Sequence, residues 1–104
     1  MKKHERYIER DDLKGATHLE VSVYYSKGGT NYFRGGVIPR GYFLSVRPVK
    51  KSDGMVSFNA FSGRSQLLLE TKRYTDKQFA RAKEMAKEWE EELIATVLSE
   101  NKVA

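Results

Sequence analysis

Apolar and polar residues alternate along most of the first three quarters of the chain. Between His18 and Ser26 every second residue is apolar, from Leu19 to Tyr25. A period of two that is rich in β-branched and aromatic residues is typical of β-strands. The same period recurs three more times before residue 74. The predicted strands span His18–Ser26, Tyr42–Val49, Met55–Phe61 and Gln66–Arg73.

The segments between these strands contain residues that favour turns. A long basic connection over 27–41 holds two glycine pairs, a lone glycine and Pro39, so it can turn sharply more than once. Two aromatic rings lie between the glycine pairs, and they either contact a ligand or fold back onto the core. Asp53 and Gly54 predict a tight hairpin turn. Pro48 is expected to end the second strand or to mark a sheet edge.

The period changes to 3.6 residues after Thr75, which predicts one long helix up to Glu100. Thr75 and Gln78 match a capping box, in which each side chain bonds the other residue's backbone N–H. Trp89 belongs to the apolar stripe of this helix, and we expect it to be mostly buried. The stripe comprises Phe79, Ala82, Ala86, Trp89, Leu93 and Val97. The residues expected around Trp89 are Val21, Leu44, Val46 and Phe58.

This order of elements predicts an α+β fold, in which a four-stranded antiparallel meander sheet is packed by one long C-terminal helix (ββββα). We expect a single domain over 18–100. Residues 1–17 are dense in charge of both signs, and we expect a weakly packed or disordered arm with one helical turn. In the fourth strand, Leu67 and Leu69 are expected to face the core and Leu68 to face away from it.

The charge of the chain is unevenly distributed. The formal net charge is +5, and the first 75 residues carry a net +7 against −2 from Asp76 onward. Between Ser26 and Tyr74 only Asp53 and Glu70 oppose nine cations. A basic middle of this kind favours an anionic partner, although modest basicity is also common in proteins that need it only for solubility.

No set of residues in the sequence suggests catalysis. The chain has no cysteine and only two histidines, His4 and His18. The acidic run around Glu88 to Glu92 is interpreted as a solvated helix face, because lysines recur nearby. We therefore expect a protein that is not an enzyme, without a cofactor or a metal site. The absence of cysteine and of any long apolar run favours a cytoplasmic protein without a membrane span.

The sheet face that points away from the helix is the candidate binding surface. Rings stack on the bases of single-stranded nucleic acid, and cations follow its phosphates. The alternation places aromatic, basic and hydrogen-bonding residues together on this face, and the Gly-rich connection adds two arginines. The alternative is that a second subunit covers the face and uses the rings as anchors. The candidate nucleic-acid-binding residues are Tyr24, Arg34, Arg40, Phe43, Arg47, Asn59, Phe61 and Lys72.

The chain resembles a single repeat of the Pur-alpha type. The resemblance rests on the ββββα order over residues 18 to 99, on Arg40-Gly41-Tyr42-Phe43-Leu44-Ser45-Val46, and on the turn Gly63-Arg64-Ser65 before a Leu-rich strand. Pur-alpha repeats and the topologically similar Whirly proteins bind single-stranded DNA or RNA through the sheet, so the resemblance implies the same function here. The long Gly-rich connection departs from that family. Phrases around it also resemble small proteins carried by bacterial mobile elements, which suggests DNA handling.

Two further expectations concern partners. Pur-like units pair two repeats and this chain has one, so we expect a homodimer. Candidate contacts are Tyr25, the Gly-rich connection, Ile94 and Leu98. The rival function is a protein–protein adaptor or dimerisation module with no nucleic-acid role, in which the aromatic face or the Gly-rich connection grips an acidic protein.

Overall fold

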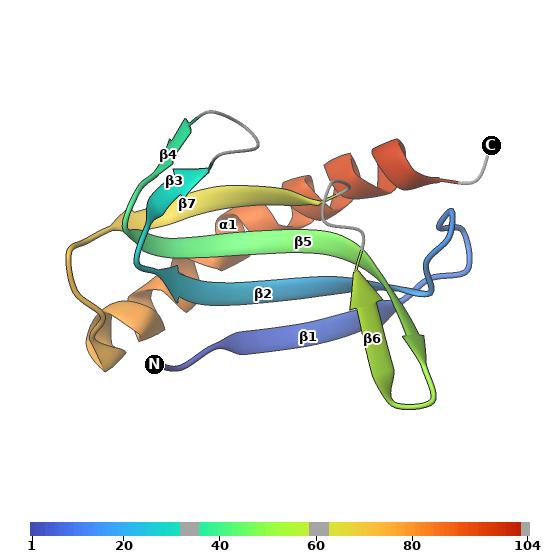
Figure 1. Ribbon diagram of the computed structural model, residues 1–104, viewed down its shortest axis with the longest axis horizontal. Coiled ribbons are helices and arrows are strands. Elements are labelled where there is room, and N and C mark those ends of the chain that lie inside the picture. Colours follow the sequence, from blue (N-terminus) through green and yellow to red (C-terminus); the bar gives the residue numbers. More distant parts are fainter. Residues whose placement is uncertain (32–35, 59–62, 103–104) are drawn as a thin grey trace.

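A computed structural model of the chain describes residues 1–31, 36–58 and 63–102, apart from the side chains of Asn31 and Phe58 (Figure 1). One face of an antiparallel five-stranded sheet packs against one long helix at the C-terminal end, so the α+β class is confirmed. The sheet contains β1 (His4–Glu9), β2 (His18–Ser26), β5 (Gly41–Ser52), β6 (Met55–Phe58) and β7 (Arg64–Glu70). The helix is α1 (Asp76–Asn101), and β3 (Gly29–Asn31) and β4 (Gly36–Ile38) form a separate two-stranded hairpin.

The first strand is the largest departure from expectation. We expected a weakly packed arm before His18, but β1 pairs antiparallel with β2 over its whole length, from His4 opposite Val23 to Glu9 opposite His18. A helical turn is therefore wrong for this segment. The strand ends face solvent, and Arg6 is bound to Glu90 of α1 through two guanidinium nitrogens. Pairing with β2, the contact of Arg6 with α1 and the packing of the partly buried Ile8 against the core hold this strand in place.

The sheet is not a simple meander. Both β6 and β7 pair with the same edge of β5: β7 pairs with Gly41–Val46 and β6 with Val49–Ser52. The twelve residues of β5 are long enough to serve both neighbours. Pro48 lies inside β5, in the interval between the two pairings. A residue without an N–H is tolerated there because that edge has no strand partner at Pro48.

A β-bulge changes the side-chain alternation of β7. Tyr42 pairs with Leu69 but Phe43 pairs with Leu67, so Leu68 is the extra residue on β7. Leu68 is buried in the core and Leu69 packs against it. The expected orientations of Leu67 and Leu68 were therefore wrong, because the bulge reverses the alternation on one side of it.

The core lies between the sheet and α1, but Trp89 is not part of it. Phe79, Ala82, Ala86 and Val97 are the buried helix residues, whereas Trp89 is 41% exposed. At 100° per residue, Trp89 lies about 80° around the helix from Phe79, at the margin of the buried face. The small side chains of Ala82 and Ala86 let the helix approach the sheet closely, so the Trp89 ring is not needed to fill the space between them. Of its expected partners, Val21, Leu44 and Val46 are in the core, and the Phe58 side chain lies outside the described part.

The helix begins as predicted at Thr75, but the second half of the capping box is different. The Thr75 hydroxyl accepts a hydrogen bond from the Gln78 backbone N–H at 3.1 Å. Gln78 does not reach back to Thr75. Instead the hydroxyl of the fully buried Tyr42 accepts from the Thr75 N–H at 2.9 Å and donates to the Thr75 carbonyl at 3.0 Å. One side chain of the sheet therefore satisfies both backbone groups of the capping residue.

This contact gives a first prediction. Tyr42→Phe removes both hydrogen bonds without changing the ring, so we expect the free energy of unfolding to fall by about 1–2 kcal/mol. Urea denaturation followed by circular dichroism measures it. Tyr25→Phe is the matched control, since it removes one longer hydrogen bond, 3.3 Å to the Thr71 carbonyl, from a half-buried hydroxyl. Equal losses in the two variants would contradict the capping role of Tyr42.

Three residues that we predicted as dimer contacts take part in the fold of one chain. Tyr25, Ile94 and Leu98 are partly buried and pack against the core. The Tyr25 ring meets the rings of Tyr42 and Tyr74 edge-on, with centroids 5.2 and 6.0 Å apart. Homodimerisation stays a prediction.

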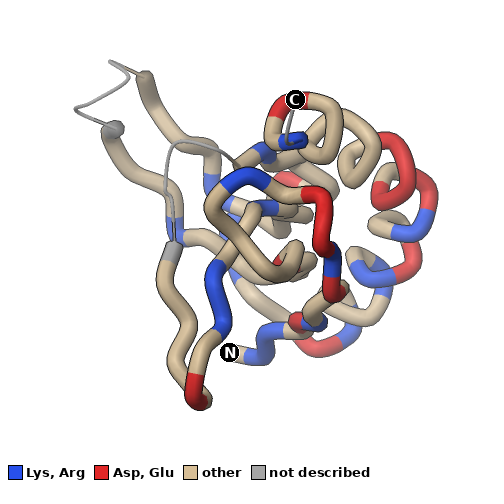
Figure 2. The backbone as a smooth tube through the Cα atoms, turned by 90° about the vertical axis from the view of Figure 1, so that its right-hand side faces the viewer, with Lys and Arg blue, Asp and Glu red and all other residues tan. Residues whose placement is uncertain are grey.

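Two hairpins stand on the side of the sheet away from α1 (Figures 1 and 2). The β3–β4 hairpin joins the end of β2 to the start of β5, and β6 folds back from the other end of β5, in front of β1 and β2 in this view (Figure 1). The turn between β5 and β6 is the predicted Asp53-Gly54 turn, with both residues at positive φ. We call this side of the sheet the front face, and it is bordered by a hairpin at each end.

Candidate functional site

On β2 and β5 the front face carries the residues that the alternation predicted. Ser22 and Tyr24 of β2 lie opposite Ser45 and Phe43 of β5, and Glu20 lies opposite Arg47. The core residues Val21, Val23, Leu44 and Val46 occupy the positions between them and face α1. Two aromatic residues, two serines and one ion pair therefore form adjacent rows across the middle of the sheet.

The two rings of the front face are not equally accessible. Tyr24 and Phe43 stack with centroids 6.0 Å apart and planes 20° apart. We expected Phe43 to offer an open ring of its own, but it is only 8% exposed and instead packs beside Tyr24. Burial raises the pKa of the Tyr24 hydroxyl, and the charge of Arg47 partly opposes this. Tyr24 is therefore a neutral ring at physiological pH.

A buried carboxylate holds Arg47 in place. Glu20 is 2% exposed; its Oε1 accepts a hydrogen bond from Nε of Arg47 at 2.9 Å and forms an ion pair with Nη2 of Arg47, also at 2.9 Å. Its Oε2 accepts a hydrogen bond from the Tyr7 hydroxyl at 3.1 Å. Burial first, and then the hydrogen bond to Glu20, raise the pKa of Tyr7, so the hydroxyl remains a donor. The three residues are in register across β1, β2 and β5.

Two hollows flank Tyr24. The first, the basic hollow, has a volume of about 400 Å³ and lies between the middle of the sheet and the segment before β1. Three of its side chains are cationic and two are serines, and none of its lining residues in the described part of the chain is Asp or Glu. Its lining residues are Met1, Lys2, Lys3, Ser22, Tyr24, Tyr25, Ser45 and Arg47.

The second, the apolar hollow, has a volume of about 360 Å³ and lies between the sheet and the β3–β4 hairpin. Val37 and Ile38 of β4 are exposed apolar residues, at 81% and 38%. Tyr24 is shared with the basic hollow. The lining residues are Tyr24, Ser26, Gly36, Val37, Ile38, Pro39, Phe43 and Ser65.

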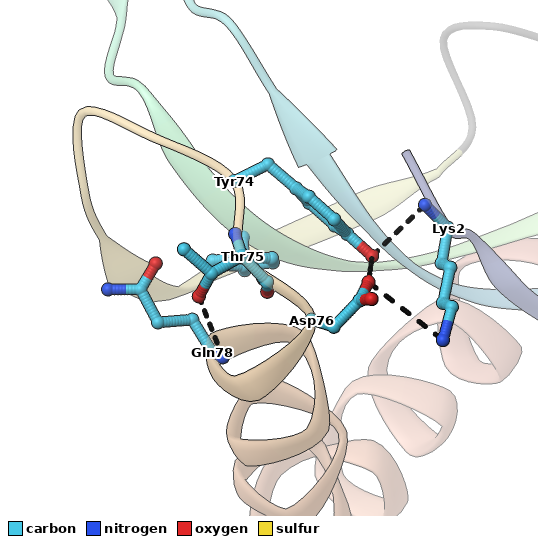
Figure 3. Close-up of polar contacts among 6 residues, drawn as sticks. Lys2, Tyr74, Thr75, Asp76 and Gln78 are labelled. Carbon is cyan, nitrogen blue, oxygen red and sulfur yellow. Dashed lines mark hydrogen bonds and ion pairs between the residues drawn. The ribbon is translucent and has the colours of Figure 1, made fainter.

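The wall of the basic hollow is tied to the start of α1 (Figure 3). The Lys2 backbone N–H donates to the Tyr74 hydroxyl at 3.1 Å, and that hydroxyl donates to Asp76 Oδ1 at 2.9 Å. The Lys2 ammonium lies 3.8 Å from the same carboxylate oxygen. Because the Tyr74 ring packs against Tyr42 and Phe79, this wall is anchored to the core.

The remaining predicted site residues do not gather on the front face. Arg40 is exposed and its Nε donates to the Lys27 carbonyl at 3.1 Å, at the base of the β3–β4 hairpin. Lys72 was expected within the last strand, but β7 ends at Glu70 and Lys72 lies exposed in the connection to α1. Arg34, Asn59 and Phe61 lie outside the described residues.

Charge is unevenly distributed over the molecule. Acidic residues outnumber the lysines and arginine of α1, whereas lysines and arginines also mark the strands and the segment before β1 (Figure 2). Within residues 1–31, 36–58 and 63–102, no group of His, Cys, Asp and Glu is placed to hold a metal ion. No helix in this part of the chain is long and apolar enough to cross a membrane.

Four residues of this site were missed by sequence reasoning. Lys2 and Lys3 belong to a segment that we expected to be weakly packed, and Tyr7 and Glu20 were not considered as partners of Arg47. One signal was present: Glu20 lies in the middle of an apolar strand, where a carboxylate needs a cation.

No family model matches the chain, and neither curated proteins nor solved structures give a match. Function is therefore inferred from the geometry of the front face.

Proposed function

We propose that this protein is a non-catalytic nucleic-acid-binding protein that holds single-stranded DNA or RNA on its front face. The observation that carries the proposal is that the basic hollow and the apolar hollow meet at one ring, Tyr24. A nucleotide likewise combines a flat base with a charged phosphate. The base would stack on Tyr24 in the apolar hollow while the phosphate lies in the basic hollow.

The shape of the face favours a single strand over a duplex. A hairpin borders each end of the face, and the ring that stacks lies at the junction of two concave hollows. Paired bases keep their faces inside the duplex and cannot reach such a ring, whereas unpaired bases can turn outward. The net negative charge of α1 would also repel a polyanion, so the molecule would meet it with the basic front face first.

The proposal predicts a tenfold loss of affinity in Tyr24→Leu. Leucine fills part of the hollow but does not stack, and stacking contributes about 1–3 kcal/mol per base. Fluorescence anisotropy with labelled single-stranded oligonucleotides of DNA and RNA measures the affinity over a salt series. Because stacking releases no counterions, the salt slope should be the same in the variant as in the parent.

Trp89→Leu is the matched control, since it also replaces a partly exposed ring by leucine, but on the helix side of the molecule. It should bind like the parent. Binding that is equally strong to duplex, or a Tyr24→Leu variant that binds single strands as tightly as the parent, would contradict the proposal.

A second candidate function has one observation in its favour. Val37 is 81% exposed beside an apolar hollow, which also suits the side chain of a protein partner. An adaptor of this kind would not bind oligonucleotides, and its affinity for a protein would change little with salt. Nucleic-acid affinity should instead fall log-linearly as salt is added.

A further inference from the structure

We infer that the basic hollow is a phosphate-binding subsite. On binding, Lys2 and Lys3 would each leave a surface carboxylate and pair with the phosphate instead. The inference rests on the proposed function and names the atoms that would take the backbone phosphate. Serine hydroxyls, lysine ammonium groups and arginine guanidinium groups are all donors, and they are the groups that bind phosphate in proteins. All three kinds line this hollow, and among the residues that the structure describes no carboxylate lines it.

The two serines form its floor. Ser22 and Ser45 lie directly opposite each other on β2 and β5, and Ser22 is 3% exposed. Arg47 lies two residues beyond Ser45 on the same strand face, where Glu20 fixes its guanidinium. Since Glu20 neutralises Arg47, this arginine would orient the phosphate through its N–H donors but would add little net charge. The net positive charge must therefore come from Lys2 and Lys3.

Each lysine has a carboxylate partner that it can give up at low cost. Lys3 pairs with Glu5 at 3.3 Å, and their side chains are 48% and 41% exposed. Lys2 pairs with Asp76 at 3.8 Å, with both side chains more than two-thirds exposed. Exposed pairs of this kind contribute little to stability, so a phosphate that meets both lysines and the hydroxyl donors beneath it would compete well with the two carboxylates.

This exchange makes an asymmetric prediction. Lys3→Gln removes a phosphate contact, so binding should weaken and the salt slope with oligonucleotides should fall by about one. Glu5→Gln removes the competitor, so binding should tighten by about two- to five-fold. Lys87→Gln is the matched control, because Lys87 forms a similar exposed pair with Glu84 on α1, far from the front face.

Three probes separate the sources of the ligand: inorganic phosphate, thymidine and thymidine 5′-monophosphate, titrated into ¹⁵N-labelled protein and followed by NMR. Phosphate should shift the amides of Lys3, Ser22 and Ser45, and the monophosphate should shift these together with Tyr24. Opposite effects of Lys3→Gln and Glu5→Gln support the subsite.

The subsite is overturned if single-stranded oligonucleotides bind normally but Lys3→Gln and Lys87→Gln behave alike. It is also overturned if Glu5→Gln weakens binding. If phosphate binds with this asymmetry but single-stranded oligonucleotides neither bind nor compete with it, the subsite stands as a free-phosphate site and the proposed function fails. The two failures are therefore distinguishable.

Discussion

Arg47→Met should lower the free energy of unfolding by about 3–5 kcal/mol, since it leaves the Glu20 carboxylate buried with one hydrogen bond from Tyr7. The two members of the pair differ in exposure: the Arg47 side chain is 30% exposed and that of Glu20 is 2% exposed. An arginine that loses its partner can turn toward water, whereas this carboxylate cannot. Glu20→Gln should therefore cost less than Arg47→Met.

Urea denaturation at neutral pH measures both single variants and the double variant that combines Arg47→Met with Glu20→Leu. Replacing a buried ion pair by apolar residues is often close to neutral, so the double variant should recover most of the stability lost in Arg47→Met. A double variant that is less stable than Arg47→Met would show that the two residues stabilise the sheet independently and not as a pair.

The Glu20 contact also changes how Arg47 can be used to test binding. From the sequence, Arg47→Ala was a natural test of phosphate contact, because the residue lies on the predicted binding face. In the structure the same change removes the partner of a buried charge, so a loss of binding would follow from damage to the sheet. Lys2 and Lys3 are better probes because their ion pairs are exposed.

Where one face of an element is buried and the other is not, the sequence predicted the structure well. The alternation over β2 and β5 assigned Val21, Val23, Leu44 and Val46 to the helix side. The start of α1 followed from Thr75, whose capping bond to Gln78 depends only on local sequence. Such features are predictable because the residues that cause them lie within a few positions of one another in the sequence.

Features that depend on distant partners were missed. In β1 only Tyr7 and Ile8 are sizeable apolar residues, because most residues of this edge strand are exposed and only Ile8 packs against the core. The strand therefore lacks the apolar alternation that indicates a half-buried strand. The bulge in β7 follows from its pairing with β5, which the local pattern of three leucines does not reveal. Trp89 lies at the margin of the buried helix face, and the docking angle of α1 determines its exposure.

The same limit applies to the candidate site. Tyr24, Phe43 and Arg47 were placed on one face from their strand positions alone. The burial of Phe43 and the two hollows arise from segments far away in the sequence: residues 1–3 form one wall and β4 forms another. Side-chain direction was therefore predictable, whereas accessibility was not.

The second large effect is expected at Gly41, where β5 begins to pair with β7. A Cβ built at this position would overlap the Leu69 carbonyl oxygen and would lie 2.9 Å from Glu70 Cα. Both are backbone atoms of the partner strand, so no side chain can move aside. Gly41 also lies two residues before Phe43, the cross-strand partner of Leu67, and the bulge already displaces β7 between Tyr42 and Phe43. We expect Gly41→Ala to lower the free energy of unfolding by about 3 kcal/mol.

The matched control is Gly36→Ala, in β4, where an added Cβ meets no atom of the described residues within 4 Å and the backbone has no positive φ. That variant should unfold within about 0.5 kcal/mol of the parent, as a surface substitution does. Hydrogen exchange distinguishes the cause in Gly41→Ala: amides of β7 should lose protection more than those of β1, because only the β5–β7 edge must separate to admit the methyl group. If Gly41→Ala keeps parental stability and β7 protection, the two strands do not approach as closely at this point as the structure shows. The position of β7, which places Ser65 beside the apolar hollow, would then also be wrong.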